Sequence, residues 1–355
     1  MNSSIHRLLF GLALCTPALA QNFVYDQPPA PNGGTLRASQ LWIDPTGQND
    51  SDNDAIAWED FVLAQDTVLT HVRWWGESAP SLGFEISFFH QDPGTIAVQP
   101  DIVQAGSGPI TQALITNFTQ ALVSGSLYVF EADLPEPVFC AANTRYFVSI
   151  VGRMPLSYTQ WRWAQSYSGT SGTFWWQRGL HMYFMLADNR AVSLASAWGA
   201  LVGTAFCPGT GNCPCGNDGQ VGLGCDNSTG EGAVLVATGS ASASADDLLL
   251  QTLSLPRNQS CLTFASASFT AGAPFFDGRR CLAGPISRFT VKNSGSSGVV
   301  SHGPGLSSYS MAHFYGANQF LAGRTLGFQT WYRDPSGPCA RLTNVSSGRS
   351  VTFTP

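Results

Sequence analysis

The chain has little charge of either sign, and this scarcity limits the classes of partner. Only 11% of its residues are Asp, Glu, Lys or Arg, where about a quarter is usual. Lys292 is the single lysine beside sixteen arginines, and the formal net charge is −6. No segment gathers several basic residues, so we expect neither nucleic acid nor an anionic membrane surface as a partner, because both attract clustered cations.

Motifs of several common enzyme and metal-binding classes are missing as well. No histidines are spaced His-x-His or His-x-x-x-His as in zinc hydrolases, and no Gly-x-Ser-x-Gly elbow of a serine esterase occurs. No Cys-x-x-Cys pair occurs either, which argues against a thioredoxin-like centre and against a zinc knuckle. We therefore assign no catalytic residue, and the sequence favours a protein that is not an enzyme.

The first twenty residues are a predicted secretory signal. The apolar run "LLFGLALC" follows a weakly basic start, and "ALA" ends at Ala20, which makes Gln21 the expected first residue of the mature chain. A membrane anchor is one alternative, but a span needs about 20 apolar residues. Lipid attachment at Cys15 is another, and the bulky Leu14 before it argues against this. We expect a secreted, extracellular or cell-surface protein without a membrane span.

Tryptophan and cysteine divide the mature chain into two regions. Eight of the ten tryptophans lie between Trp42 and Trp176, whereas seven of the eight mature cysteines lie at or after Cys207. Two domains also suit this length. We predict four segments: a signal peptide over 1–20, a Trp-rich domain over 21–190, a linker over 191–205, and a Cys-, Gly- and Ser-rich domain over 206–355.

Short segments rich in β-branched and aromatic residues follow one another in both domains, separated by Gly, Pro, Asp or Asn. No window shows a sustained helical period, so helices should be scarce. In "TVLTHVRWW" alternation predicts four side chains on one face of a strand: Val68, Thr70, Val72 and Trp74. We predict an all-β chain of two antiparallel, jelly-roll-like β-sandwich domains, the second of them stitched by disulfides.

The mature cysteines are interpreted as disulfide partners, because an even number in an exported chain is typical of disulfides. Cys213 and Cys215 stand only two residues apart, at the edge of bridging distance, so each should pair elsewhere. The pairing itself stays open, since eight cysteines allow 105 combinations. The candidates are Cys207, Cys213, Cys215, Cys225, Cys281 and Cys339, together with Cys140 and Cys261.

Several of these cysteines lie in a recognisable pattern. The stretches "FCPGTGNCPCGNDGQVGLGC", "DGRRCLAGPISR", "FQTWYRD" and "SVTFTP" resemble a C-terminal module common in secreted proteins of planctomycete-type bacteria. The front half, with "WEDFVLAQDTVLTHVRWWG" and "RYFVSIVG", is similar to β-sandwich modules of the same kind of exported protein. The resemblance implies extracellular all-β modules without an assigned activity. Cys140 and Cys261 lie outside the matching stretches.

An acidic stretch is the single candidate for a metal site. Asp50, Asp52 and Asp54 alternate like the first ligands of an EF-hand loop, but Ala55 and Phe61 stand where that loop needs Gly and Glu. One interpretation is calcium held by these three carboxylates and backbone oxygens. The other is a solvated polar turn. No other cofactor is expected.

Glu59 and Asp60 are the nearest approach to a catalytic carboxylate pair. Adjacent residues of a strand face opposite sides, so these two side chains cannot flank one glycosidic bond. We expect ordinary charges at the rim of the sandwich.

Tryptophan doublets and alternating tryptophans are the best functional signal. Exposed indole rings beside arginine and glutamine can stack on sugar rings while the polar neighbours bind hydroxyl groups. The alternative is a core role for Trp74, Trp161 and Trp163, with one member of each doublet facing outward. The ligand-binding candidates are Trp74, Trp75, Trp161, Trp163, Trp175, Trp176, Arg162 and Arg178.

Three functional hypotheses follow. The leading one is a secreted, non-enzymatic binding protein of the cell surface or matrix that recognises glycan or protein through aromatic residues. Its partners would be a polysaccharide or a cell-surface protein. A carbohydrate-active enzyme, a lyase or glycosidase on a jelly-roll scaffold, is the first alternative. A structural envelope module is the second.

Overall fold

A computed structural model describes residues 23–102 and 108–355 of the chain. The predicted signal peptide, with Cys15 and the expected cleavage site, lies outside the described residues. The described chain is 47% strand and 5% helix, which confirms the all-β prediction. Its single α-helix in this described part is α1 (Leu306–His313), and the 3-10 turns are η1 (Pro31–Gly33), η2 (Arg178–Leu180) and η3 (Gly316–Asn318).

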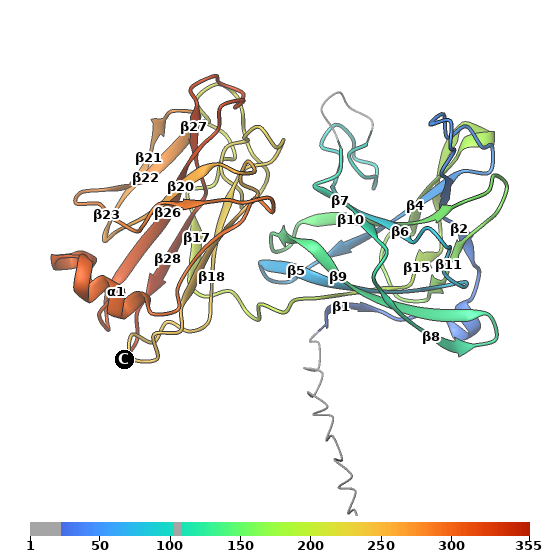
Figure 1. The fold of residues 1–355 in the computed structure, drawn as a ribbon, viewed down its shortest axis with the longest axis horizontal. Helices are drawn as coiled ribbons and strands as arrows, with labels where there is room; N and C mark the ends of the chain where they lie inside the picture. Colours follow the sequence, from blue (N-terminus) through green and yellow to red (C-terminus); the bar gives the residue numbers. More distant parts are fainter. Residues whose placement is uncertain (1–22, 103–107) are drawn as a thin grey trace, which may run out of the picture.

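Residues 23–195 form an N-terminal lobe, the N-lobe, around two seven-stranded sheets (Figure 1). The first sheet has the order β1-β16-β5-β11-β2, with β9 on β5 and β8 on β9. Its strands are β1 (Phe23–Gln27), β2 (Arg37–Ala38), β5 (Thr67–Gly76), β8 (Thr119–Ser124), β9 (Leu127–Cys140), β11 (Arg162–Trp163) and β16 (Val192–Ala195).

The second sheet of the N-lobe has the order β14-β13-β4-β3-β10-β6-β7. Its strands are β3 (Gln40–Trp42), β4 (Ala55–Val62), β6 (Phe84–His90), β7 (Thr111–Ile115), β10 (Arg145–Met154), β13 (Thr173–Gln177) and β14 (Met182–Leu186). All its pairings are antiparallel except β3 with β10. A short pair, β12 (Gln165–Ser166) with β15 (Asn189–Arg190), completes the lobe.

The core of the N-lobe lies between these sheets and is dominated by aromatic rings. Trp74 stacks on Phe130 at 5.4 Å between ring centroids, and Phe84 packs edge-on against Trp161 at 4.9 Å. All four rings are at most 1% exposed. Rings of this size each bury 150–250 Å² on average, which accounts for a core built from few but large side chains.

Residues 204–355 form a C-terminal lobe, the C-lobe, with a second all-β arrangement. Its largest sheet has the order β17-β28-β26-β20-β23, with β24 on β20 and β27 on β26; a three-stranded sheet β18-β19-β25 and the hairpin β21–β22 complete it. The strands are β17 (Thr204–Phe206), β18 (Val234–Thr238), β19 (Leu249–Leu253), β20 (Ser260–Ser266), β21 (Ser268–Phe275), β22 (Gly278–Ala283), β23 (Ser287–Arg288), β24 (Lys292–Asn293), β25 (Val300–His302), β26 (Thr325–Arg333), β27 (Thr343–Val345) and β28 (Gly348–Thr352).

The two lobes lie side by side and share an apolar contact (Figure 1). Val68, Phe139 and Ala141 of the N-lobe pack with four C-lobe side chains: Leu223, Val234, Val236 and Leu253. Trp198 and Leu201, on the segment that joins the lobes, pack against the same cluster. The lobes therefore meet through a small hydrophobic core of their own.

Two ion pairs and one histidine–carboxylate contact also cross from lobe to lobe. His90 Nε2 lies 2.9 Å from a carboxylate oxygen of Glu231, and Arg349 Nη1 lies 3.3 Å from Asp66. Arg257 pairs with Glu136 in the same way. Only the Arg257–Glu136 pair is largely exposed, and a surface pair of that kind contributes about 0–1 kcal/mol, whereas His90, Glu231 and Arg349 are largely buried at the contact.

Three disulfides stitch the C-lobe, as the sequence predicts. They join Cys207 to Cys281, Cys213 to Cys225, and Cys215 to Cys339. The alpha carbons joined by each bridge are 5.8–5.9 Å apart, and Cys281 is the one half-cystine that lies within a strand, β22. Cys213 and Cys215 indeed pair with different partners.

The prediction that Cys140 and Cys261 are also disulfide partners is wrong in this structure. Both thiols are free and buried, because Cys140 lies in the N-lobe core beside Val138 whereas Cys261 lies in the C-lobe beside Tyr332. Two separate hydrophobic cores hold them apart. Burial raises the pKa of the Cys140 thiol and raises that of Cys261 to about 12, which keeps both as unreactive thiols.

We expect the chain that begins at Gln21 to react with iodoacetamide only after it is denatured. Without reduction, denatured protein should then carry two labels, at Cys140 and Cys261, located by peptide mass spectrometry. The native protein should carry none, because the thiolate is the reacting species and both groups are buried. Absence of label after denaturation would mean that these two cysteines are linked, contrary to the structure.

Candidate functional site

Four of the predicted ligand-binding tryptophans are buried, which corrects that interpretation for them. Trp74 and Trp163 are 0% exposed, Trp161 is 1% exposed and Trp75 is 8% exposed. The Trp161 indole N–H donates to the carbonyl of Glu77 at 3.1 Å, and that of Trp163 donates to Ala191 at 2.8 Å. Rings packed on both faces offer no surface to a sugar, so these residues form the core and not a binding site.

The doublet Trp175 and Trp176 on β13 divides between inside and outside, as neighbours on a strand must. Trp175 packs against the core, and its indole N–H donates to the carbonyl of Ala38 at 2.8 Å. Trp176 points to the other side of the sheet, where it joins the outer aromatic cluster of Trp58 and Phe174. Only one ring of the doublet is therefore placed for an external ligand.

Trp176 belongs to a surface that we call the hairpin face, made of the half-buried Trp176 and Arg178 and the exposed Tyr183 and Met185. In the register of β13 with β14, Trp176 lies opposite Tyr183 and their ring centroids are 6.5 Å apart. Tyr183 is 48% exposed and Met185 is 47% exposed. The guanidinium carbon of Arg178 lies 5.5 Å from the centre of the Trp176 ring, within cation–π range.

Local sequence explains why this hairpin forms at the margin of the sheet. Gly172 precedes β13 with a φ of +82°, and a Cβ there would lie 1.9 Å from the carbonyl oxygen of Leu186. Only glycine accepts that approach. At the other end, His181 adopts a left-handed conformation with a φ of 51° and turns the chain into β14. β14 is the last strand of its sheet, which leaves its outer edge without a neighbouring strand.

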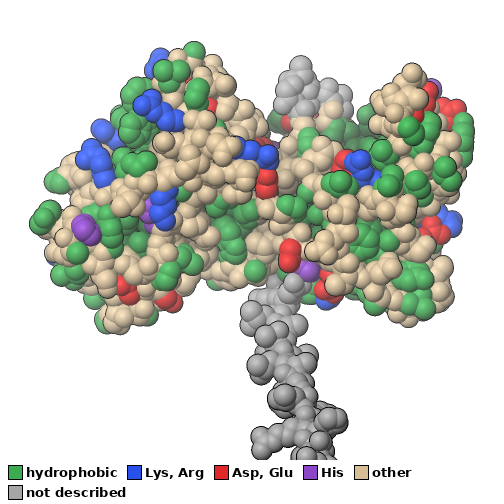
Figure 2. All heavy atoms as spheres, viewed as in Figure 1, with side chains coloured by type: hydrophobic (Ala, Val, Ile, Leu, Met, Phe, Trp, Pro, Cys, Tyr) green, Lys and Arg blue, Asp and Glu red, His purple; other side chains and the backbone are tan. Residues whose placement is uncertain are grey.

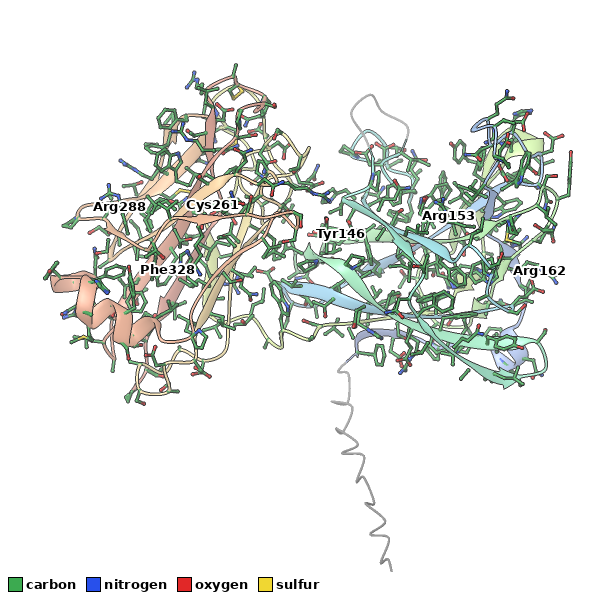
Figure 3. All side chains as sticks on the ribbon, viewed as in Figure 1. Tyr146, Arg153, Arg162, Cys261, Arg288 and Phe328 are labelled. Carbon is green, nitrogen blue, oxygen red and sulfur yellow. A yellow bond between two sulfur atoms is a disulfide. The ribbon has the colours of Figure 1, made fainter. Side chains whose placement is uncertain are left out.

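The two predicted arginines have different surroundings. Arg178 joins the hairpin face, whereas Arg162 lies in the other sheet, on β11, at the outer end of the N-lobe (Figure 3). Arg162 makes a two-pronged pair with Glu77, with N–O distances of 2.9 and 2.5 Å. Arg162 therefore does not form a binding site with its sequence neighbours Trp161 and Trp163, because both of these rings are buried in the core.

The three aspartates of the calcium hypothesis do not converge on a common point, which corrects that prediction. Asp50 and Asp52 are exposed, while Asp54 is 1% exposed. The Asp54 carboxylate accepts the Trp42 N–H at 2.9 Å and lies 3.5 Å from Arg178. Within residues 23–102 and 108–355 no group of three His, Cys, Asp or Glu is placed to hold a metal ion. The Asp54 carboxylate instead pairs with Arg178 at the turn that joins β13 to β14.

Glu59 and Asp60 do point to opposite sides of β4, but they are not rim charges, which corrects the sequence expectation. Glu59 is 0% exposed and Asp60 is 1% exposed. Asp60 pairs with Arg145 on the outer side of the sheet. Both carboxylates are thus committed to structural contacts, and burial raises the pKa of Asp60.

The Glu59 carboxyl lies in a buried polar network on the inner side of β4. The Gln27 amide donates to one of its oxygens at 2.6 Å, and the Arg190 backbone N–H donates to the other at 2.8 Å. The Thr173 hydroxyl lies 3.0 Å from that second oxygen. Burial is the largest influence and raises the pKa of Glu59 to about 8, which makes the neutral acid the main form at neutral pH.

A cavity of about 320 Å³ lies at the junction of the lobes. Its polar lining includes the Glu136–Arg257 ion pair and the contact of His90 with Glu231, so both carboxylates of the lining already have a partner. Beside it, burial and the Glu231 charge raise the pKa of Asp226 to about 7. The geometry offers one weak acid near the cavity and no second free carboxylate.

Comparison with known proteins adds no relative. No family model matches the chain, and no curated protein matches it. Among the described residues, no helix is long and apolar enough to cross a membrane.

Sequence reasoning did not single out Tyr183 and Met185, which complete the hairpin face. Their strand, β14, reads "MYFML", five residues without an acidic or basic side chain. A charge-free strand at the margin of a sheet is unusual, because natural edge strands are commonly protected by charge. Once the sheet order is known, the absence of charge on the edge strand β14 indicates that this surface has a function.

Proposed function

We propose that this protein is an exported, non-enzymatic binding protein that recognises glycan or protein through the hairpin face. The observation that supports this best is the pairing of the half-buried Trp176 ring with the exposed Tyr183 ring, with the Arg178 guanidinium against the indole. A flat apolar surface beside a cationic donor suits a sugar ring with its hydroxyl groups. Neutral polysaccharide is the ligand that this small, weakly charged surface fits best.

Export is part of the same proposal. Three intramolecular disulfides suit an oxidising compartment outside the cytosol. The predicted signal over 1–20 and the resemblance to two-module secreted proteins of planctomycete-type bacteria agree with that location. A non-enzymatic role is supported by the commitment of Glu59 and Asp60 to buried contacts.

A polysaccharide array tests the proposal, read both for retention of the protein and for release of reducing ends. We expect retention without release. Trp176→Ala and Tyr183→Ala should each weaken binding by about tenfold or less, since ring contacts of this kind contribute about 0.5–1.5 kcal/mol. Tyr167→Ala is the matched control, because Tyr167 is 76% exposed and lies outside the hairpin face.

Each other outcome contradicts a definite part of the proposal. Release of reducing ends would establish a carbohydrate-active enzyme instead. Neither retention nor release, on glycans or on surface proteins, would favour a structural envelope module. An equal loss of binding in Tyr167→Ala would move the site away from the hairpin face.

A further inference from the structure

The two lobes differ sharply in charge. Between residues 21 and 205 there are sixteen acidic and seven basic residues, a net charge of −9. Between 206 and 355 there are seven acidic and nine basic residues, a net charge of +2. On the face shown in Figure 2, blue side chains are spread over the upper part of the C-lobe. The weakly acidic total therefore conceals a basic lobe.

Ion pairing sharpens this difference. Every arginine of the N-lobe has an acidic partner within its own lobe. In the C-lobe only Arg257 and Arg349 are paired, and both partners, Glu136 and Asp66, belong to the N-lobe. Six C-lobe arginines have no acidic partner among the described residues: Arg279, Arg280, Arg288, Arg324, Arg333 and Arg341.

Two of these arginines, Arg288 and Arg333, lie on the outer face of the large C-lobe sheet. Arg288 pairs in register with Phe264 on β20, whose side chain packs in the outer cluster with Leu282 and Trp331. Arg333 follows Trp331 by two residues on β26 and so shares its face. Figure 3 shows Arg288 at the margin of the lobe, with Phe328 in its interior.

Aromatic rings form a platform at the same place. The Phe276 and Trp331 rings are nearly parallel, with an interplanar angle of 18° and centroids 6.4 Å apart. Phe276 is 44% exposed. Arg280 completes the group, with its guanidinium carbon 5.2 Å from the centre of the Phe275 ring. A hollow of about 150 Å³ beside Trp331 is lined by Val291 and Arg333.

The acidic residues nearest in sequence do not neutralise these arginines. Asp277 and Asp334 are both 0% exposed. Asp277 accepts backbone N–H groups of Cys339 at 3.3 Å and of Arg341 at 3.1 Å, and Asp334 accepts that of Ser228 at 3.1 Å. Both hold loops inside the lobe, and neither forms an ion pair with Arg280, Arg288 or Arg333, so these three arginines keep their charge for an external partner.

We propose that this cationic face, made of Arg280, Arg288, Arg333, Phe276 and Trp331, binds a polysaccharide that carries carboxylate or sulfate groups. The inference rests on the proposed glycan-binding function and adds a second site with a different ligand class. Arginine suits the task because its planar fork bonds two oxygens of an anionic group at once. The neighbouring rings provide a surface on which a sugar ring can stack.

The test is affinity electrophoresis of the mature full chain in gels that contain polygalacturonate, dextran sulfate or neutral dextran. We expect the two anionic polymers to retard the protein, and the retardation to fall as NaCl rises from 50 to 500 mM because salt screens the arginines. Arg288→Gln and Arg333→Gln should each weaken binding about threefold to fivefold, and Phe276→Ala by a similar factor.

Arg324→Gln is the matched control, because it removes the same charge from an arginine that bonds the Gly316 carbonyl, away from the platform. It should leave binding unchanged, and unchanged melting temperatures should show that all variants are folded. Absence of retardation by both anionic polymers, equal loss in Arg324→Gln, or stronger retardation by single-stranded DNA would each overturn the inference.

The two proposals fail separately. Suppose that neutral glycan retains the protein, that Trp176→Ala loses this retention, and that anionic glycan does not bind. This result would contradict only the proposal for the cationic face. Binding of anionic glycan that needs Arg288 and Arg333 but not Trp176 would support the cationic face and remove the role of the hairpin face.

Discussion

Removal of the Cys215–Cys339 disulfide, by Cys215→Ala with Cys339→Ala, should destabilise the C-lobe by about 5 kcal/mol. The bridge closes a loop of 124 residues, and a closed loop of that length restricts the unfolded chain strongly. Guanidinium unfolding of the non-reduced protein, followed by circular dichroism, measures the loss.

Removal of the Cys213–Cys225 bridge is the control for loop length. It closes only 12 residues, so the same double substitution should cost about 3 kcal/mol. All four substitutions exchange a half-cystine for alanine, which keeps the chemistry matched. A larger loss for the short loop than for the long one would show that contacts around the sulfurs, and not chain restriction, determine the effect.

The buried Glu59 carboxyl should make the folded protein less stable as the solution becomes more alkaline. Its pKa is about 8 in the folded chain against an ordinary value of 4.5, so the folded state retains a proton that the unfolded state releases. Stability from this group is fully present below about pH 4.5 and is lost as the pH rises through about 8. One pKa unit corresponds to about 1.4 kcal/mol, so the loss amounts to several kcal/mol at most.

Glu59→Gln isolates this contribution. The amide oxygen can still accept the Arg190 N–H beside Thr173, while the amide N–H₂ takes the place of the oxygen that faces Gln27, and the group does not titrate. We expect the difference in unfolding free energy between the wild type and Glu59→Gln to change across pH 5–8. Asp226→Asn serves as the comparison, since the pKa of Asp226, about 7, acts in an overlapping range. A constant difference for Glu59→Gln would mean that the carboxyl is ionised in the folded chain.

The positions of the strands can be predicted well from the sequence. The side of the sheet on which each side chain lies can be predicted only where the strand pairing is regular. The segment "TVLTHVRWW" is β5, and Val72 and Trp74 do enter the N-lobe core. Leu69 enters it too, while Val68 turns to the contact with the C-lobe, so the predicted common face of Val68 and Val72 is wrong. The register with β9 shifts between Leu69 and His71. Opposite that shift β9 contains Pro135 and Pro137, which have no N–H to donate.

The candidate sites were only partly predictable for a related reason. A tryptophan has the same pattern whether it lies in a core or on a surface, and here Trp163 and Trp176 differ only through the layer that covers each. The arginines of the cationic face are scattered between Arg280 and Arg333 in the sequence, so no run of basic residues announces them. Their common feature, the lack of an acidic partner, exists only in the folded lobe.

The apolar contact between the lobes has a practical consequence for anyone who would express them separately. A chain cut between residues 196 and 203 would expose Phe139 on the N-lobe and Val236 on the C-lobe to solvent, because these side chains belong to the cluster that the two lobes bury together. Solvent-exposed hydrophobic patches of this sort promote aggregation. The separate lobes would then bind nonspecifically to solid supports and to one another. Binding measured on one isolated lobe would therefore resemble specific ligand binding.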